Sequence, residues 1–517
     1  MSLYSRERTR RSLFATVGYR SISQVATVLS YVVLVRGISE ESFGVYSLLY
    51  SFVTILTTFG SLGLDQTLKR YQPEFLSKGQ GRLANALVRL VRRARFASNV
   101  LLILLVILGW RWIGSWFGLE EHLPDFLLFA TVLLLYFQTN ILQFALSANM
   151  LHQYSIGSIA VISVTKLVAY SALSLSGSLT LQWAIGADLI AYGLAYAFLA
   201  IMYRRRVVSQ AGGTVDALPD GERSRLTRYA TYNHFNDSAS VLVYSETDRF
   251  FLAAMLNPLA VGTYAFYTRM TEMLSSLVPT TLFDSLIQPL MFSVKLSEAR
   301  EKLPKYFTLL LNMNLAYHLP VLVFSIVCHR EIVDFVFGGK FQQYSSLLPL
   351  VVAMATTGNV FAVPITIVAQ YQEKARLILF SEIFGLYQVL AMLVLIPALG
   401  LYGAALSTGS FHLLRNLFVW WNVRDLARWT SWRSTIMSAL FVWGATLAIG
   451  WVVTTWLSLP PLLDLILVGL LCALAALVYF RAPGLCATDR ELIGNVMQGR
   501  EARLLRLAGI LAPASGA

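Results

Sequence analysis

Long apolar segments constrain the fold of this chain more than any other feature. Fourteen of them follow one another, and each suits a membrane-spanning helix, which needs about 20 predominantly apolar residues. Charged residues make up 13% of the 517, whereas a soluble domain carries about 25%. The sequence therefore predicts an all-α integral membrane protein with about 14 transmembrane helices. The segments are 13–35, 43–64, 96–116, 126–147, 156–174, 181–203, 229–256, 261–288, 306–328, 345–368, 377–396, 402–421, 434–456 and 461–480.

The distribution of Lys and Arg between these segments predicts the topology. If the first end lies inside and the helices alternate, the inner segments hold 32 of the 41 basic residues, and the outer side holds four when Arg111, at the outer end of 96–116, is included. Basic residues are enriched in cytoplasmic loops, so both termini are predicted to be cytoplasmic. The same bias accounts for most of the net charge of +13, and no nucleic-acid partner is needed to explain it.

An internal repeat predicts two lobes. Gly44 and Tyr46 align with Gly262 and Tyr264, and the offset spans six helices, an even number. The two halves should therefore share one orientation and be related by a pseudo-two-fold axis along the membrane normal. The aligned stretches are 32–46, "VVLVRGISEESFGVY", and 250–264, "FFLAAMLNPLAVGTY". The predicted parts are a six-helix lobe at 1–203, a cytoplasmic linker at 204–228, a second six-helix lobe at 229–421, accessory helices 13 and 14 at 434–480, and a cytoplasmic tail at 481–517.

Polar side chains form stripes on the helices that open the two halves. Spacings of three and four place them on one face of each helix, which predicts a wet cavity between the lobes. The alternative is ordinary packing of helices through Ser and Thr. Acidic residues lie on the same helices or near them, and Asp237, Glu246 and Asp248 are the predicted cavity acids.

Three basic residues inside predicted helices are candidate ligands for an anion. Lys166 lies ten residues from Ile156, about 15 Å at 1.5 Å per residue, and so near the middle of the membrane. Arg20, like Lys166, has no charged neighbour on its own helix, and Arg269 lies on a polar stripe next to a possible local partner, Glu272. Cations that face a cavity favour an anionic substrate. For Lys166 a structural ion pair with Asp188 is an equally open alternative.

Two acids of the second half are candidates for ion coupling. Asp237 and Glu382 lie a few residues inside the inner face, where a carboxylate could bind a cation or a proton. For Glu382, pairing with Lys374 or Arg376 is the alternative that the sequence favours. No cofactor is expected, because no nucleotide-binding motif is present. The three cysteines, Cys328, Cys472 and Cys486, have no metal-ligand spacing and are interpreted as packing residues.

The sequence resembles a known group of membrane proteins. Residues 36–75, "RGISEESFGVYSLLYSFVTILTTFGSLGLDQTLKRYQPEF", resemble the start of bacterial polysaccharide flippases of the multidrug/oligosaccharidyl-lipid/polysaccharide superfamily. Residues 247–270, "TDRFFLAAMLNPLAVGTYAFYTRM", are similar to the seventh and eighth helices of that family. The resemblance implies two six-helix lobes, alternating access, and an inner-membrane transporter rather than an enzyme.

The resemblance also implies a substrate and partners. The substrate would be an undecaprenyl-pyrophosphate-linked oligosaccharide, flipped from the inner to the outer leaflet for O-antigen, capsule or exopolysaccharide synthesis. Membrane lipids and a polysaccharide polymerase would be the partners. In the related lipid II flippases, arginines on helices 1, 2 and 8 serve the pyrophosphate, and Arg20 and Arg269 match the first and last. Helix 2 of this chain has no basic residue, which argues against lipid II itself, and Lys166 is expected to compensate.

Two rival functions are weighed against this one. A cation-coupled multidrug exporter of the same fold would use acids in its cavity, and Asp237, Glu246 and Asp248 keep it open. A membrane glycosyltransferase or polymerase would need a large outer loop with catalytic acids, and the longest outer segment, 329–344, is too small. Helices 13 and 14 are expected to face lipid, or else to flank the acyl chain of the substrate.

Overall fold

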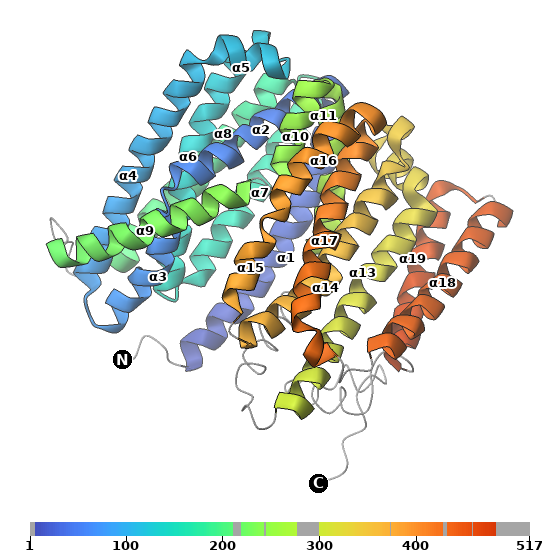
Figure 1. Ribbon diagram of the computed structural model, residues 1–517. Helices are drawn as coiled ribbons and strands as arrows, with labels where there is room; N and C mark the ends of the chain where they lie inside the picture. The colour runs from blue at the N-terminus through green and yellow to red at the C-terminus, as the bar shows by residue number, and fades with distance from the viewer. Residues whose placement is uncertain are drawn as a thin grey trace. The chain divides into compact units, whose positions relative to one another are not determined.

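The computed structural model describes residues 6–209, 219–241, 245–276, 299–372, 374–427, 432–457 and 459–481. Within these ranges every regular element is a helix and no strand occurs (Figure 1). Each of the fourteen predicted segments contains a described helix. The predicted all-α membrane fold is confirmed.

Among the described residues, eight helices are long and apolar enough to cross a membrane. A ninth span is obtained if α4 and α5, which are bent by 73° at their junction, are counted as one. Within the described ranges, the other predicted segments hold helices that are shorter or more polar. The chain is therefore a multi-span helical membrane protein.

Contacts divide the chain into two compact units, Met1–Ala265 and Phe266–Ala517. The division falls inside α11, whereas the sequence placed it in the segment 204–228. Helices α9 and α10, which were expected to open the second lobe, pack in the first unit, since α10 contacts α2 and α5 and α9 contacts α3. The helices of the first unit are α1 (Arg6–Gly37), α2 (Glu40–Gly60), α3 (Leu64–Ser77), α4 (Gly81–Leu108), α5 (Trp110–Phe117), α6 (Leu123–Ala148), α7 (His152–Leu175), α8 (Leu181–Tyr203), α9 (Asp220–Ser240), α10 (Ser245–Met255) and the start of α11 (Pro258–Ser276).

The start of α2 shows how local sequence sets a helix boundary in the first unit. The side chain of Ser39 accepts a hydrogen bond from the backbone N–H of Ser42, and Glu40 and Glu41 occupy the first turn. A serine cap and acids at the N-terminus both stabilise a helix start. The helix then buries large apolar side chains such as Phe43 and Phe52 inside the unit.

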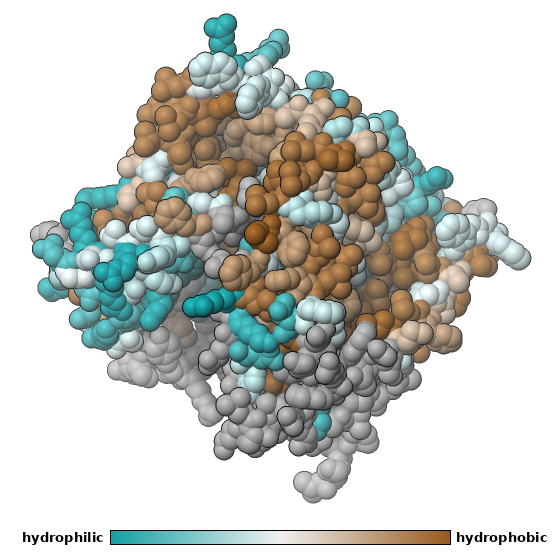
Figure 2. Space-filling model, in the orientation of Figure 1, coloured by the Kyte–Doolittle hydropathy of each residue, from teal (hydrophilic) through white to brown (hydrophobic). Residues whose placement is uncertain are grey.

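Helix α3 is amphipathic. Leu68, Tyr71 and Phe75 are buried in a core cluster that also holds Leu226 of α9. The polar face of α3 stays exposed, and polar side chains gather around α3 and α9 on the surface (Figure 2). The outer faces of the spanning helices carry exposed apolar side chains instead, as expected for contact with lipid.

The second unit is built around α13. This helix contains Pro304 and Pro320 and leaves helical geometry at Cys328, and it packs against α14, α18 and α19. Cys328 and Cys472 are buried and free, in agreement with their interpretation as packing residues; Cys486 lies outside the described residues. The helices of this unit are α13 (Ala299–Phe337), α14 (Leu347–Tyr371), α15 (Ala375–Ser381), α16 (Phe384–Leu399), α17 (Leu401–Ala427), α18 (Trp432–Leu457) and α19 (Pro461–Arg481).

A polar contact anchors α19, the last helix, to α13. The Tyr479 hydroxyl on α19 donates to Oδ1 of Asn312 at 3.2 Å. On the surface of the unit, the side chains of Phe441 and Trp456 on α18 are 79% and 83% exposed. The two helices therefore combine a specific attachment to the unit with an apolar free face.

Candidate substrate site

Lys166 forms an ion pair with Asp188. The Nζ atom of Lys166 on α7 lies 2.8 Å from Oδ1 of Asp188 on α8, and the two side chains are 15% and 1% exposed. Of the two alternatives that the sequence left open, this pair is the one that the structure shows. Lys166 is therefore not an uncompensated cation. Its role as a ligand for an anion stays a prediction.

Tyrosines complete the surroundings of this ion pair. Asp188 also accepts hydrogen bonds from the hydroxyls of Tyr46 on α2, at 2.7 Å, and Tyr170 on α7, at 2.5 Å. The Nζ atom of Lys166 lies 5.1 Å from the centroid of the Tyr192 ring. A buried carboxylate needs several donors to offset its desolvation, and here a lysine and two phenols supply them. This cluster joins α2, α7 and α8.

A hydroxyl-lined cavity lies in the same unit. Its volume is about 280 Å³, close to the lower limit of about 300 Å³ for pockets that bind small molecules. The threonines belong to the predicted polar stripe of α2, with Thr58 beside it, and Glu246 is one of the predicted cavity acids. The lining residues are Thr54, Thr57 and Thr58 of α2, Tyr136 of α6 and Glu246 of α10.

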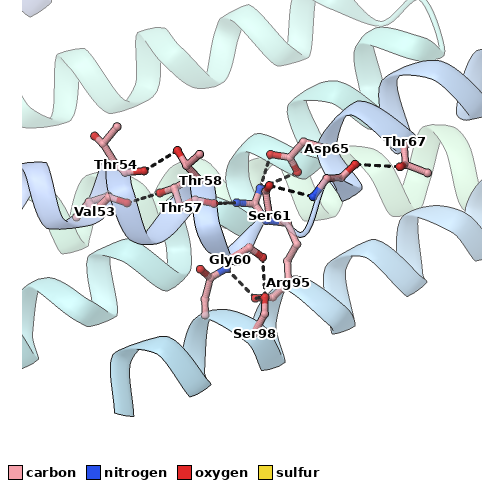
Figure 3. A network of polar contacts seen from close by, with 12 residues as sticks. Val53, Thr54, Thr57, Thr58, Gly60, Ser61, Asp65, Thr67, Arg95 and Ser98 are labelled. Atoms are coloured by element: carbon pink, nitrogen blue, oxygen red, sulfur yellow. Dashed lines mark hydrogen bonds and ion pairs between the residues drawn. The ribbon is translucent and has the colours of Figure 1, made fainter. Parts of the chain in front are cut away.

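Arg95 is a buried functional candidate that the sequence reasoning missed. Its side chain is fully buried, and Nη1 donates to both carboxylate oxygens of Asp65 at 2.7 and 2.6 Å (Figure 3). Nη2 donates to the backbone carbonyl of Thr57 at 3.0 Å, and the guanidinium lies 4.7 Å from the centroid of the Phe137 ring. Arg95 therefore ties α4 to the end of α2 that lines the cavity.

A signal in the sequence could have revealed Arg95. The buried positions of α4 include Ala84, Val88, Val91, Arg95 and Asn99, which recur at spacings of three and four. These spacings form one face of a helix. Arg95 is the last residue before the apolar segment 96–116 and counts among the inner basic residues of the predicted topology, which obscures its position on this buried face.

The two arginines that were expected to bind pyrophosphate differ in their contacts. Arg20 on α1, in the first unit, is exposed and forms no ion pair with any residue that the structure describes. Arg269 on α11, in the second unit, pairs with Glu272 at 2.7 Å, with side-chain exposures of 47% and 45%. The local pairing of Arg269 that the sequence offered is thus present. Binding of one anion by Arg20, Lys166 and Arg269 together stays a prediction.

The charged residues of α10 do not form the ion pair that their spacing in the sequence permits. Glu246 and Arg249 lie three residues apart, a spacing at which opposite charges can neutralise each other across one turn. Within the described part of the chain, Arg249 instead contacts Ser51 of α2, with Nη1 3.4 Å from the hydroxyl, and no ion pair with Glu246 forms. Asp248 is fully buried and accepts a hydrogen bond from the Tyr264 hydroxyl at 2.7 Å. Close packing of α10 on α2 turns Arg249 away from its helical neighbour.

Glu382 has a partner other than the two that the sequence favoured. Its Oε1 atom lies 2.8 Å from Nη2 of Arg415 on α17, and Lys374 donates instead to the backbone carbonyl of Asn422. The expected pairing of Glu382 with Lys374 or Arg376 is therefore wrong, because the approach of α15 and α17 in space replaces the neighbours in sequence. Asp237 lies half-buried on α9. In the described residues, no group of three or more His, Cys, Asp or Glu side chains could hold a metal ion.

Solved structures show the same fold. A structure of "Lipid II flippase MurJ, inward closed conformation" matches with a TM-score of 0.63 at 14% identity, covering 92% of this chain and 99% of that one. An inward-facing multidrug resistance MATE family transporter of the MOP superfamily matches with a TM-score of 0.59 at 14% identity, covering 80% and 99%. At such identities the likeness concerns the fold alone. No curated protein matches the sequence.

A comparison with protein families matches most of the first unit and the start of the second. Residues 10–293 match the family described as "Polysaccharide biosynthesis protein", which is more than half of the 517 residues. The matched range includes the whole cavity lining, the Lys166–Asp188 pair and both arginines, Arg20 and Arg269. The resemblance seen in the sequence is thus confirmed at the level of the family, and the chain belongs to the polysaccharide biosynthesis protein family.

Proposed function

We propose that this protein is a flippase for an undecaprenyl-pyrophosphate-linked oligosaccharide. It would carry the saccharide from the inner to the outer leaflet of the bacterial inner membrane during synthesis of a surface polysaccharide. The observation that carries the proposal is the family match over residues 10–293, the range that holds the cavity lined by threonines, Tyr136 and Glu246. The fold shared with a lipid II flippase supports a lipid-linked substrate.

The physical problem for such a transporter is the polar headgroup. Sugar hydroxyls and phosphates lose strong hydrogen bonds in hydrocarbon, at several kcal/mol for each unsatisfied group. A cavity lined by hydroxyls within spanning helices replaces those bonds. The polyprenyl chain can stay in the bilayer, and the apolar free face of α18 and α19 offers it a surface. Alternating access then moves the headgroup without hydrolysis of any bond by this protein.

We propose that Arg20 and Arg269 hold the pyrophosphate. A guanidinium binds phosphate oxygens through two parallel N–H donors, and such charge-assisted bonds are stronger than neutral ones. Arg20 is exposed and free of ion pairs within the described residues, so phosphate binding breaks no contact there. Arg269 would release Glu272 and bind phosphate oxygens in its place. Lys166, which is held by Asp188, would support the site through its charge.

Two acidic residues are the candidates for coupling substrate transport to an ion gradient. We propose that one of Asp237 and Glu382 takes up the cation or proton that drives the return of the transporter to its starting conformation. Protonation of Glu382 would release Arg415, its partner at 2.8 Å, which gives the uptake of a proton a structural consequence. A coupling role of Asp237 alone predicts that Glu382→Gln transports normally.

A multidrug exporter is the second candidate, and one observation favours it. Glu246 lines the cavity, and a carboxylate there would attract a cationic drug. The two functions are separated by deletion of the gene in its own host. A flippase predicts loss of surface polysaccharide and accumulation of lipid-linked oligosaccharide on the inner leaflet, with unchanged resistance to cationic drugs. Lower drug resistance with normal surface polysaccharide would favour the exporter.

Complementation of this deletion tests the proposed residues. Arg20→Ala and Arg269→Ala should each abolish polysaccharide export while the amount of protein in the membrane stays constant. Arg111→Ala is the matched control, because Arg111 is an exposed arginine at the start of α5. Export that survives both Arg20→Ala and Arg269→Ala would contradict pyrophosphate binding by these residues.

The orientation is tested separately by reporter fusions. Reporters fused after residue 120 or 340 should report from outside, and reporters after residue 80, 215 or 490 should report from the cytoplasm. The physical reason is the bias of Lys and Arg toward one side. A cytoplasmic signal after residue 340 would contradict the proposed topology.

A further inference from the structure

The cavity of the first unit has a chemistry that differs from that of the two arginines. We infer that the cavity lined by Thr54, Thr57, Thr58, Tyr136 and Glu246 is a subsite for a sugar ring, separate from the groups that hold the pyrophosphate. This inference rests on the proposed function and deepens it, because it says which part of the substrate each group of residues contacts.

The hydrogen-bond capacity of the threonines carries the argument. Thr57 and Thr58 each donate their hydroxyl hydrogen to the backbone carbonyl four residues earlier, Val53 and Thr54 (Figure 3). Thr54 makes a longer bond of the same kind, 3.4 Å to the carbonyl of Tyr50. A hydroxyl has one hydrogen and two acceptor lone pairs. With the hydrogen used inside the helix, each threonine presents acceptors to the cavity.

Glu246 adds a further acceptor of negative charge. An ionised carboxylate only accepts hydrogen bonds, so Glu246 offers no donor to a ligand, and the three lining threonines favour a ligand that donates. Sugar hydroxyls and amino-sugar ammonium groups donate, whereas pyrophosphate is an acceptor with negative charge and would be repelled. The cavity is therefore complementary to the saccharide and not to the phosphates.

Tyr136 fits the same ligand through its ring. Its centroid lies 5.6 Å from the Tyr192 ring in an edge-to-face arrangement, and Tyr192 in turn contacts Lys166. The ring is thus held in place and offers an apolar face beside the acceptors. A sugar ring complements both features, because it has C–H groups on its faces and hydroxyls at its edge. The volume, about 280 Å³, suits one or two sugar rings rather than a long saccharide.

Arg95 is a positioning residue for this subsite. The last carbonyls of a helix have no partner within it, and α2 ends at Gly60. Arg95 donates to the carbonyl of Thr57 at 3.0 Å, and Ser98 donates to that of Gly60 at 2.6 Å. Both donors come from α4, so the turn that carries Thr57 and Thr58 is fixed by side chains outside α2 (Figure 3).

Binding measurements on the full-length protein in lipid nanodiscs test the inference. The variants are Thr57→Val, Thr58→Val, their double variant and Glu246→Gln. Thr67→Val is the matched control: Thr67 is buried and donates to the carbonyl of Gly63 at 2.9 Å, the same kind of bond on a helix that does not line the cavity. Three probes are compared: the lipid-linked oligosaccharide extracted from the host membrane, the same saccharide released from its lipid by mild acid, and undecaprenyl pyrophosphate without sugar.

A sugar subsite predicts a selective loss. Each Thr→Val change should weaken binding of both saccharide probes about threefold to tenfold, and Glu246→Gln about tenfold or more, by the usual range for neutral and charged hydrogen bonds. Binding of undecaprenyl pyrophosphate should not change, and Thr67→Val should bind all three probes like the wild type. Equal loss for undecaprenyl pyrophosphate, or no loss for either saccharide probe, would overturn the inference.

The free saccharide separates this inference from the proposed function. A wild-type protein that binds the released saccharide but neither lipid probe would refute the flippase substrate and leave the sugar subsite standing. A wild-type protein that binds both lipid probes but loses nothing in the Thr→Val and Glu246→Gln variants would refute the subsite and leave the flippase standing. Absence of binding to all three probes overturns both.

Discussion

Lys166 and Asp188 neutralise each other inside the membrane-spanning part of the first unit, with Nζ 2.8 Å from Oδ1. Two tyrosine hydroxyls donate to the same carboxylate. This arrangement makes the lysine part of the structure, because removing it leaves a buried carboxylate without its counter-charge. Removing one member of a buried ion pair costs about 3–5 kcal/mol.

The first prediction therefore concerns stability. Lys166→Ala and Asp188→Ala should each lower the unfolding temperature in detergent and the amount of protein in the membrane. The neutral double variant Lys166→Met/Asp188→Asn should recover most of the loss, since one of the Tyr46 and Tyr170 hydroxyls can still donate to the amide oxygen and the other can accept from the amide N–H. The measurement is thermal unfolding of the purified variants. A Lys166→Ala protein that unfolds like the wild type but exports no polysaccharide would make Lys166 a substrate ligand instead.

Arg95 leads to a second prediction about stability. Its guanidinium satisfies Asp65 and the Thr57 carbonyl at once, and no ammonium can reproduce that fork. Arg95→Lys should lower the free energy of unfolding by about 1–3 kcal/mol and Arg95→Ala by about 3–5 kcal/mol. Arg93→Ala is the control, because Arg93 on the same helix is exposed. Equal unfolding temperatures for Arg95→Ala and Arg93→Ala would show that the buried contacts contribute little.

Much of the fold could be predicted because a membrane imposes its own pattern. A helix that crosses hydrocarbon must satisfy its backbone internally and present apolar side chains, so each predicted segment contains a helix. The polar stripe of α2 was also readable, since Thr54 and Thr57 depart from that apolar pattern at helical spacing. They line the cavity together with Glu246.

The contact partners of charged side chains and the boundary between the two units could not be predicted from the sequence, because they depend on which helices approach each other in space. Glu382 has basic neighbours in sequence, yet it pairs with Arg415 of α17. Arg249 has Glu246 one turn away, yet it contacts Ser51 of α2. The contact units divide inside α11 for the same reason, since α9 and α10 pack against helices of the first unit.

The repeat-related glycines Gly44 and Gly262 lie in backbone contact, which gives a third prediction. A Cβ atom at Gly44 would lie 2.0 Å from the carbonyl oxygen of Pro258, and one at Gly262 would lie 2.8 Å from Cα of Gly44. Alanine at either position must separate α2 from α11. Gly44→Ala and Gly262→Ala should therefore lower the unfolding temperature and impair export.

The control for this crossing is Gly186→Ala. Gly186 lies within α8, and a Cβ atom there would meet nothing within 4 Å. Alanine is better than glycine inside a helix by up to about 1 kcal/mol, so this variant should be as stable as the wild type or slightly more stable. If Gly44→Ala behaves like Gly186→Ala, the backbone contact between α2 and α11 is not needed for the folded state.

The last prediction concerns pH and the attachment of α9 to α3. Lys78 and Arg225 both donate to Glu74, which lowers the pKa of this carboxyl from its ordinary value of 4.5. A depressed folded-state pKa stabilises the protein above the ordinary value, and this contribution is lost as the pH falls below about 4.5. Unfolding temperatures measured between pH 3 and 7 should therefore fall less steeply on the acid side in Glu74→Gln than in the wild type. Glu121→Gln, at an exposed acid outside this cluster, should keep the wild-type profile; identical profiles for all three proteins would exclude Glu74 as a pH-dependent contact.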